Sequence, residues 1–140
     1  MSGARQPSFR IGELSARCGR SVHAIRWYEA QGLIPGVLRD TGGRRVYNTR
    51  HVGWLTLMER LRITGMSVAQ MRHYTQLVVQ GRSTLAERRR MLAEHRRAVE
   101  ARIADYRRAL ALIDRKIGFY EEWIDSGQRP DDPIAPDKPH

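Results

Sequence analysis

The stretch AIRWYEAQGLIP, residues 24–35, decides the fold of this chain. It places an arginine and two aromatic residues on a short predicted helix that Gly32 and Pro35 bring to an end. Ser21 offers an N-cap for this helix, and Val22 and Ile25 then face inward. The positions expected to face outward are Ser21, His23, Ala24, Arg26, Trp27 and Tyr28. A short helix with so cationic and aromatic a face suits contact with a polyanion.

A second short helix is predicted immediately before this one. Ile11, Leu14 and Cys18 have the spacing of one inward face, and Gly19 is suited to the residue that follows a helix. Two short helices joined by a tight turn that contains glycine form the outline of a helix-turn-helix. Cys18 lies at an inward position, where a cysteine behaves as a small hydrophobic residue.

A small β wing is predicted over residues 38–47, after the helix-turn-helix. Gly42 and Gly43 allow the positive φ values of a hairpin turn, and Arg44 and Arg45 lie at its tip. Arginines there can reach a phosphate or the minor groove beside a site that a helix reads. A solvated basic loop is the alternative interpretation.

Two further helices follow the wing. The first has an N-cap at Asn48 or Thr49 and the second opens with a capping box that runs from Ser67 to Gln70. Their inward positions are Val52, Leu55, Met58 and Leu61 in the first helix and Met71, Tyr74 and Val78 in the second.

A long helix is predicted from about residue 84 to residue 125. Apolar residues recur in it with alternating steps of four and three, which defines a heptad seam. The seam residues are Val99, Ile103, Tyr106, Leu110, Ile113, Ile117, Tyr120 and Ile124. Towards the N-terminal end the same spacing meets Arg96 and Arg89, which interrupt the apolar stripe. Because a solitary helix cannot bury such a stripe, a partner helix is implied.

The net charge of +10 points to nucleic acid as the partner. Residues 1–80 carry 12 basic and 4 acidic side chains, so the polyanion should bind to the N-terminal half. No apolar run approaches the length of about 18 residues that a membrane span needs, so we expect a cytoplasmic protein without a membrane partner. The single cysteine and five scattered histidines show no metal-ligand spacing, and no catalytic motif is present. We therefore expect no metal, no cofactor and no enzymatic activity.

Within the helix-turn-helix we expect different side chains to contact different parts of the nucleic acid. His23 and Ala24 should lie near base edges, and Arg26 and Tyr28 on the phosphate backbone. Trp27 should pack partly against the next segment. The alternative is that Trp27 and Tyr28 are ordinary core aromatics and that Arg26 is a solvated charge.

Four motifs in this order resemble the winged helix-turn-helix of the MerR family of bacterial transcription regulators. They are IGEL at residues 11–14, IRWYE at 25–29 with GLI at 32–34, GRRVY at 43–47, and the run from Leu61 to Gly65-Met66-Ser67. The long helix, with KIGFY at residues 116–120 near its end, is similar to the dimerisation helix of the short members of the family.

The resemblance implies a mainly α fold, in which a winged helix-turn-helix precedes a dimerisation helix that forms an antiparallel coiled coil. The homodimer would bind a pseudo-palindrome in a promoter spacer, and would bend and untwist double-stranded DNA so that RNA polymerase engages both promoter elements. Arg26, Tyr28, Arg45 and Tyr47 align with family positions that hold the DNA backbone, and His23 aligns among those that face bases.

The chain also departs from its relatives within that family. Residues 79–128 contain no cysteine, which argues against thiolate sensing, and Arg60 occupies the place of the sensing cysteine of aldehyde-responsive members. No large effector domain follows the long helix, so a small-molecule effector is either absent or bound between the winged domains and the long helices. Arg89 and Arg96 could help to bind an anionic effector there, and the alternative is ion pairing with Glu87, Glu94 or Glu100.

The predicted organisation has four parts: a flexible N-terminus (1–8), a DNA-binding domain (9–82), a coiled-coil helix (83–125) and a disordered tail (126–140). Two other classes of protein remain open. One is a monomeric architectural or excisionase-like DNA binder. The other is a coiled-coil interaction protein whose basic domain binds nucleic acid without reading its sequence, or an acidic protein surface.

Overall fold

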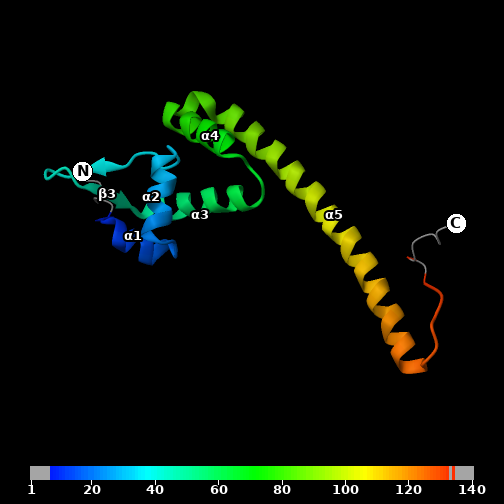
Figure 1. Cartoon of the computed structure of the whole chain (residues 1–140). Coiled ribbons are helices and arrows are strands. Elements are labelled where there is room, and N and C mark those ends of the chain that lie inside the picture. Colours follow the sequence, from blue (N-terminus) through cyan, green and yellow to red (C-terminus); the bar gives the residue numbers. More distant parts are fainter. Residues whose placement is uncertain (1–6, 133, 135–140) are drawn as a thin grey trace. The chain divides into compact units, whose positions relative to one another are not determined.

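The computed structural model describes residues 7–132 and 134, which contain the helical segments and short strands drawn in Figure 1. Their order is β1 (Ser8–Phe9), α1 (Ile11–Cys18), α2 (Val22–Ala30), β2 (Leu38–Arg39), β3 (Arg45–Asn48), α3 (Thr49–Ile63), α4 (Val68–Gln80), the 3₁₀ turn η1 (Arg82–Thr84) and α5 (Leu85–Ser126). The chain forms two compact units that divide between His95 and Arg96, and each unit is described by itself.

The helix-turn-helix has the predicted form. Leu14 and Cys18 of α1 are buried, and Gly19 ends the helix with a φ of 71° and an N–H that donates to the Ser15 carbonyl. Ser21 is the N-cap of α2, where its hydroxyl accepts from the backbone N–H of Ala24 at 3.0 Å. These caps fix the short turn between the two helices because they satisfy backbone groups that the helix ends leave unpaired.

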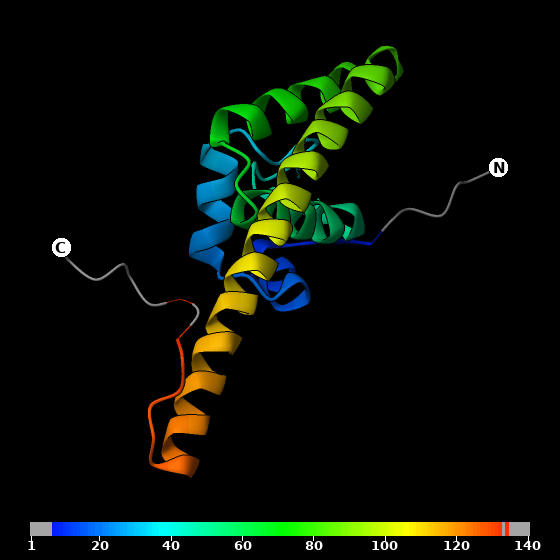
Figure 2. The same cartoon turned by 90° about the vertical axis from the view of Figure 1, so that its right-hand side faces the viewer.

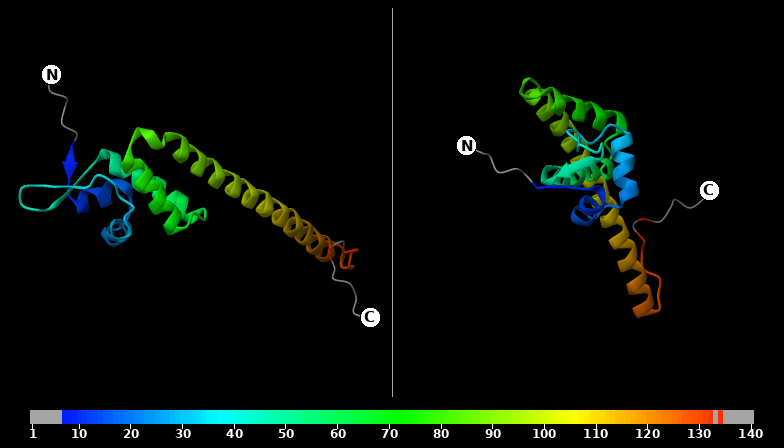
Figure 3. Two further views of the ribbon diagram at one scale, coloured as in Figure 1. Left: turned by 90° about the horizontal axis from the view of Figure 1, so that it is seen from above. Right: turned by 90° about the vertical axis from the view of Figure 1, so that its left-hand side faces the viewer.

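The wing is part of a three-stranded antiparallel sheet in the order β1-β3-β2, and its loop projects from the helices of the first unit (Figure 3). Gly43, with a φ of 80°, supplies the left-handed residue of the turn. Strand β1 pairs Ser8 with Asn48 and Phe9 with Tyr47. The prediction that the flexible N-terminus extends to residue 8 is therefore wrong at Ser8, while residues 1–6 lie outside the described part.

The core of the first unit is assembled by α3 and α4 against the helix-turn-helix. Both predicted caps are present, with Asn48 before α3 and the Ser67–Gln70 capping box before α4. Leu55, Met58 and Met71 are fully buried in the stripes that the sequence indicates. A hydrogen bond connects this core to residues 24–35, because the Trp54 indole N–H donates to the Leu33 carbonyl at 2.6 Å.

The first turns of α5 belong to the winged unit. Met91 and Leu92 pack against the buried core, and His95 Nε2 lies 2.8 Å from the Thr64 hydroxyl. The compact unit therefore extends to residue 95, whereas the predicted domain boundary lies between residues 82 and 83.

In the second unit α5 is one helix up to Ser126, after which the chain turns back along its last turns (Figure 2). Lys116 forms an ion pair with Asp132, and the Arg129 guanidinium lies 5.5 Å from the centre of the Trp123 ring. Phe119 is buried beside these contacts. The predicted disordered tail is therefore wrong for residues 126–132, because α5 includes Ser126 and these polar and cation–π contacts hold the following chain; residues 133 and 135–140 lie outside the described part.

The heptad seam of α5 is largely uncovered in the single chain. Tyr106 is 70% exposed and Ile124 is 79% exposed, and among the eight seam residues only Val99 is half-buried.

Within residues 7–132 and 134, none of the helices combines the length and the apolar character needed to cross a bilayer. In the same part of the chain, no three His, Cys, Asp or Glu side chains gather where a metal ion could be held.

Candidate nucleic-acid interface

Five arginines from three segments of the first unit surround one open cavity of about 350 Å³. They come from the loop before α1, from α2 and from the two sides of the wing: Arg10, Arg26, Arg39, Arg44 and Arg45. Glu29 and the buried Tyr47 also line the cavity. A concave surface with this charge suits the phosphates of a nucleic acid, which arginine can bind through two parallel hydrogen bonds.

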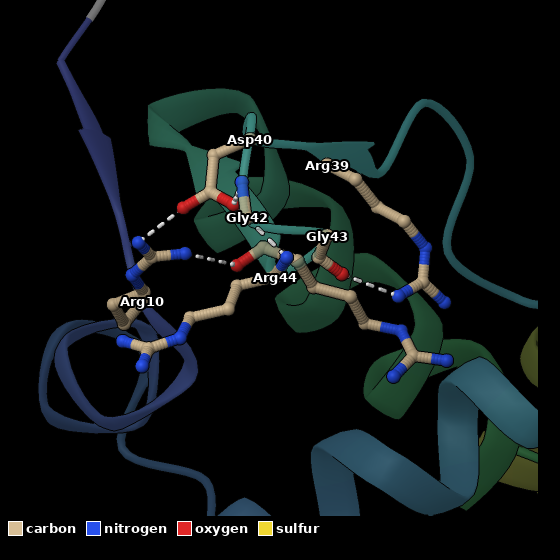
Figure 4. A network of polar contacts seen from close by, with 7 residues as sticks. Arg10, Arg39, Asp40, Gly42, Gly43 and Arg44 are labelled. Carbon is tan, nitrogen blue, oxygen red and sulfur yellow. Dashed lines mark hydrogen bonds and ion pairs between the residues drawn. The ribbon is translucent and has the colours of Figure 1, made fainter.

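Asp40 fixes the wing turn. Its Oδ1 accepts from the backbone N–H groups of Gly42 at 3.0 Å and Arg44 at 2.9 Å, and its Oδ2 pairs with the Arg10 guanidinium (Figure 4). The Arg10 hydrogen bond, helped by the Arg44 N–H, holds the pKa of the Asp40 carboxyl below its usual range. On the opposite side of the turn the Arg39 side chain donates to the Gly43 carbonyl at 2.7 Å (Figure 4).

Glu29 links α2 to the wing. Its Oε1 lies 2.7 Å from Arg45 Nε, and its Oε2 accepts from the Tyr47 hydroxyl at 3.3 Å. Burial raises the pKa of Tyr47, and the nearby Glu29 carboxylate raises it further, so the phenol keeps its proton and donates. This chain of contacts sets the direction of Arg45, half of whose side chain is exposed to solvent.

The predicted outward face of α2 is only partly outward. His23 and Arg26 are exposed, and Ala24 is half-buried. Trp27 is half-buried, with the Arg62 guanidinium of α3 4.5 Å above its ring. Tyr28 is only 3% exposed, so the prediction that it faces outward is wrong.

Tyr28 and Tyr47 lie inside for related reasons. Tyr28 follows Ile25 by three residues and therefore shares its inward helical face, where its ring packs edge-on against Trp27 at 5.1 Å. Tyr47 is the buried position in the alternating pattern of β3 and is 1% exposed. Burial leaves both phenols little surface to offer a phosphate, although Tyr47 still borders the arginine cavity.

Arg10 and Arg39 also belong to this surface, although the sequence motifs did not predict them as members of it. Arg39 pairs directly with Arg45 in the β2–β3 register, so the hairpin pattern itself could have found it. No local pattern could have found Arg10, because its partner Asp40 is thirty residues away in sequence.

Arg72, Arg96 and Cys18 have structural contacts elsewhere in the chain. Arg72 donates to the Gln31 carbonyl at 2.9 Å and so secures the end of α2. Arg96 Nε lies 2.8 Å from Glu100 Oε1. This ion pair is the alternative to the prediction that Arg96 helps to bind an anionic effector. Cys18 is buried, as expected of a small hydrophobic residue.

An exposed α2 beside a wing whose arginines line the same cavity defines a class of protein, the winged helix-turn-helix nucleic-acid binders. Comparison with known proteins identifies the family within that class. Residues 9–77 match the MerR HTH family regulatory protein, and residues 52–116 match the family's DNA-binding region, described as "MerR, DNA binding".

Individual relatives indicate the same family. The chain is 33% identical over 94 residues to the HTH-type transcriptional regulator ZntR homolog of Haemophilus influenzae, which covers 67% of this chain and 70% of the relative. A MerR family transcriptional regulator from Listeria monocytogenes has a similar structure, with a TM-score of 0.80 and 31% identity over 86% of this chain and 91% of that one.

A third relative was solved on DNA. HiNmlR, a MerR family regulator lacking the sensor domain and bound to promoter DNA, has a TM-score of 0.76 and 28% identity over 87% of this chain and 97% of that one. The present chain therefore belongs to the MerR family of DNA-binding transcription regulators, as its motifs predicted.

Proposed function

We propose that this chain binds a promoter as a homodimer and regulates transcription from it. The observation that carries the proposal is the convergence of five arginines, from the loop before α1, from α2 and from the wing, on one open surface. Like its relatives, which are transcription regulators, it would act in the cytoplasm and without enzymatic activity.

In this proposal the exposed side of α2 enters the major groove and the wing lies on the neighbouring backbone. His23 and Ala24 face base edges, with Ser21 holding the start of the helix. Arg26, Arg44 and Arg45 contact phosphates, and Arg10 and Arg39 add to the same positive surface. Trp27 and the two buried tyrosines support this face from below rather than form its contact layer.

The seam of α5 is the proposed dimer interface. Two copies of the helix, packed antiparallel, would bury the eight apolar seam residues that a single chain leaves uncovered. A homodimer of this kind has a two-fold axis, so its two wings present the same contacts to two half-sites of a pseudo-palindrome.

Regulation would act through the shape of the DNA. Arginine contacts on the backbone of both half-sites can hold a promoter spacer in a bent and untwisted form, and RNA polymerase would then reach both promoter elements. Such a mechanism depends more on firm phosphate contacts than on many base contacts, which agrees with the large number of arginines and the short α2.

A footprint on the DNA upstream of the chain's own gene and its neighbours tests the proposal. We expect a roughly symmetric protected region between the two promoter elements, with enhanced cleavage at its centre where the DNA is distorted. Arg45→Ala should lose the protection, and Arg97→Ala, which changes an exposed arginine of α5, should keep it. Uniform weak protection along all fragments would instead favour a nucleic-acid binder that does not read sequence.

A further inference from the structure

His51 is a buried titratable side chain that lies outside the arginine-lined surface. It belongs to the first turn of α3 and is only 4% exposed. Its Nδ1 accepts from the backbone N–H of Asn48 at 3.0 Å, which completes the capping box at the start of α3. Its Nε2 lies 2.8 Å from the carbonyl oxygen of Pro35. One imidazole therefore connects the start of α3 to the end of β3 and to the loop that follows α2.

The two partners of His51 determine which ring nitrogen carries the proton. A backbone carbonyl can only accept a hydrogen bond, so Nε2 is the protonated nitrogen that donates to Pro35. A backbone N–H can only donate, so Nδ1 keeps its lone pair for Asn48. The neutral ring is thus the form that satisfies both partners. A second proton, on Nδ1, would set one donor against another at 3.0 Å and open the capping box.

The charge of the surroundings also favours the neutral ring. Besides Asn48, the described residues that share the adjoining cavity with the ring are Pro35, Gly36, Arg50, Trp54, Val78 and Val79. The charged residue of this set is Arg50, which is itself positive. On the side of β3 the ring packs against Tyr47, whose hydroxyl already donates to Glu29. A second proton on His51 would therefore place a positive charge in a buried site that supplies no carboxylate for it among these described neighbours.

His51 supports both of the elements that we place on DNA. Its ring packs edge-on against Tyr47, with the ring centres 5.6 Å apart. Tyr47 donates to Glu29, and the Glu29 carboxylate holds Arg45 of the wing. On its other side, the bond to Pro35 holds the loop that joins α2 to the wing. The helix that faces the bases and the arginine that faces a phosphate therefore share one buried support.

We propose that His51 is a positioning residue for the DNA-contact surface, a role that rests on the proposed function, and that only its neutral ring fills this role. Imidazoles take up a proton between about pH 8 and 5, so acidification through this range should weaken DNA binding while the chain stays folded. Charge alone predicts the opposite, because protonation of the exposed His23 and His73 adds positive charge to a protein that binds a polyanion. The wing turn keeps its Asp40 contacts in this range, because the pKa of that carboxyl is lowered.

The pH dependence of DNA binding in matched histidine variants tests this role. His51→Gln keeps an acceptor for the Asn48 N–H and removes the group that takes up a proton. His73→Gln is the control, since it makes the same exchange at an exposed histidine that pairs with Glu87. Fluorescence anisotropy gives the affinity for a duplex taken from the footprinted promoter, at about pH 7.5 and about pH 5.5, on either side of the histidine range. Circular dichroism at both pH values follows the fold.

Lowering the pH should reduce the affinity of the parent and of His73→Gln about tenfold more than that of His51→Gln, the effect expected of one lost buried hydrogen bond. Equal changes in all three proteins would overturn the role of the neutral ring. Unfolding of the parent at the lower pH would overturn it as well, because His51 would then support the whole fold rather than the contact surface.

Arg45→Ala tests the route from His51 to the DNA. Because His51 acts on Arg45 through Tyr47 and Glu29, a chain without Arg45 should lose less affinity on acidification than the parent. The same loss in both would show that His51 acts without Arg45, and would overturn the positioning role.

Binding of the parent at the higher pH keeps this test separate from the proposed function. A parent that binds no duplex there would overturn the DNA-binding surface itself, on which the role of His51 rests. A parent that binds, but with the pH dependence of His51→Gln, would overturn the role of His51 alone and leave the DNA-binding surface intact.

Discussion

Glu29 is the acidic side chain that lines the cavity formed by five arginines, and its contacts explain why it is there. It accepts from Tyr47 and pairs with Arg45, so it sets the direction of the guanidinium that we place on the DNA backbone. An arginine side chain that is already ordered in the free protein loses less conformational freedom when it binds a phosphate. The cost is one negative charge on a surface that binds a polyanion.

Arg45→Ala should weaken binding to cognate and random DNA by a similar factor, because a phosphate contact carries no sequence information. The slope of log K against log salt should become shallower by about 1. Fluorescence anisotropy titrations at several salt concentrations measure both quantities, with Arg97→Ala as a charge-matched control. An unchanged slope for Arg45→Ala would contradict the phosphate contact.

His23→Ala should act differently, because the exposed His23 is expected to face base edges. We expect loss of affinity for the cognate site of roughly 1–3 kcal/mol and little change on a scrambled site. Competition titrations with the two sequences give the ratio of the affinities for the cognate and the scrambled site. Equal losses on both would show that His23 contributes to binding without reading the sequence.

At the scale of single elements, the wing depends on polar contacts more than on burial. Leu38, Arg39, Arg44 and Arg45 are all exposed, and Asp40 ties the turn together through two backbone N–H groups and Arg10. Because the pKa of Asp40 is lowered, its contribution is present above the ordinary aspartate pKa and is lost as the pH falls through the lowered value. The turn should therefore be insensitive to pH between about 5 and 8.

Asp40→Ala should speed the exchange of the Gly42 and Arg44 amide hydrogens, because both lose their acceptor. Asp40→Asn is the matched control, since its amide oxygen can still accept from both groups and only the Arg10 ion pair is lost. Hydrogen exchange followed by NMR distinguishes the two. Equal rates in Asp40→Ala and the parent would show that the turn is held by its strands alone.

Elements and their caps were predictable from this sequence because their causes are local. Ser21, Asn48 and Ser67 each begin a helix through a bond to a residue no more than three positions away. The exposed face of α2 was harder to predict, because Tyr28 packs into a core that α3 and the sheet help to form. Strand β1 and the position of Arg10 could not be predicted from local sequence, since each depends on a partner more than 25 residues away.

At the scale of the whole molecule, the seam was visible in the sequence, whereas the fold-back after α5 was not. The four prolines within residues 126–140 are typical of disorder, yet the Lys116–Asp132 ion pair and the Arg129–Trp123 contact hold the described part of this segment. Ion pairing and cation–π contact across more than five residues leave no periodic signal in a sequence.

Ile113→Asp should give monomers at concentrations where the parent chain is a dimer, because it buries a charge near the centre of the proposed seam. Leu112→Asp is the matched control: Leu112 is its neighbour, 48% exposed, and lies off the seam. Multi-angle light scattering gives the molar mass of each. A dimer that survives Ile113→Asp would place the interface elsewhere.

The choice of arginine over lysine has a practical consequence for handling this protein. Lys116 and Lys138 are its only lysines, and Lys116 is engaged with Asp132 and lies over the rings of Phe119 and Tyr120. Reagents that attack lysine amines, such as the activated esters used for dyes and sensor chips, therefore find no lysine on the arginine-lined surface. A chain attached to a sensor through its lysines should keep its DNA-binding chemistry unmodified.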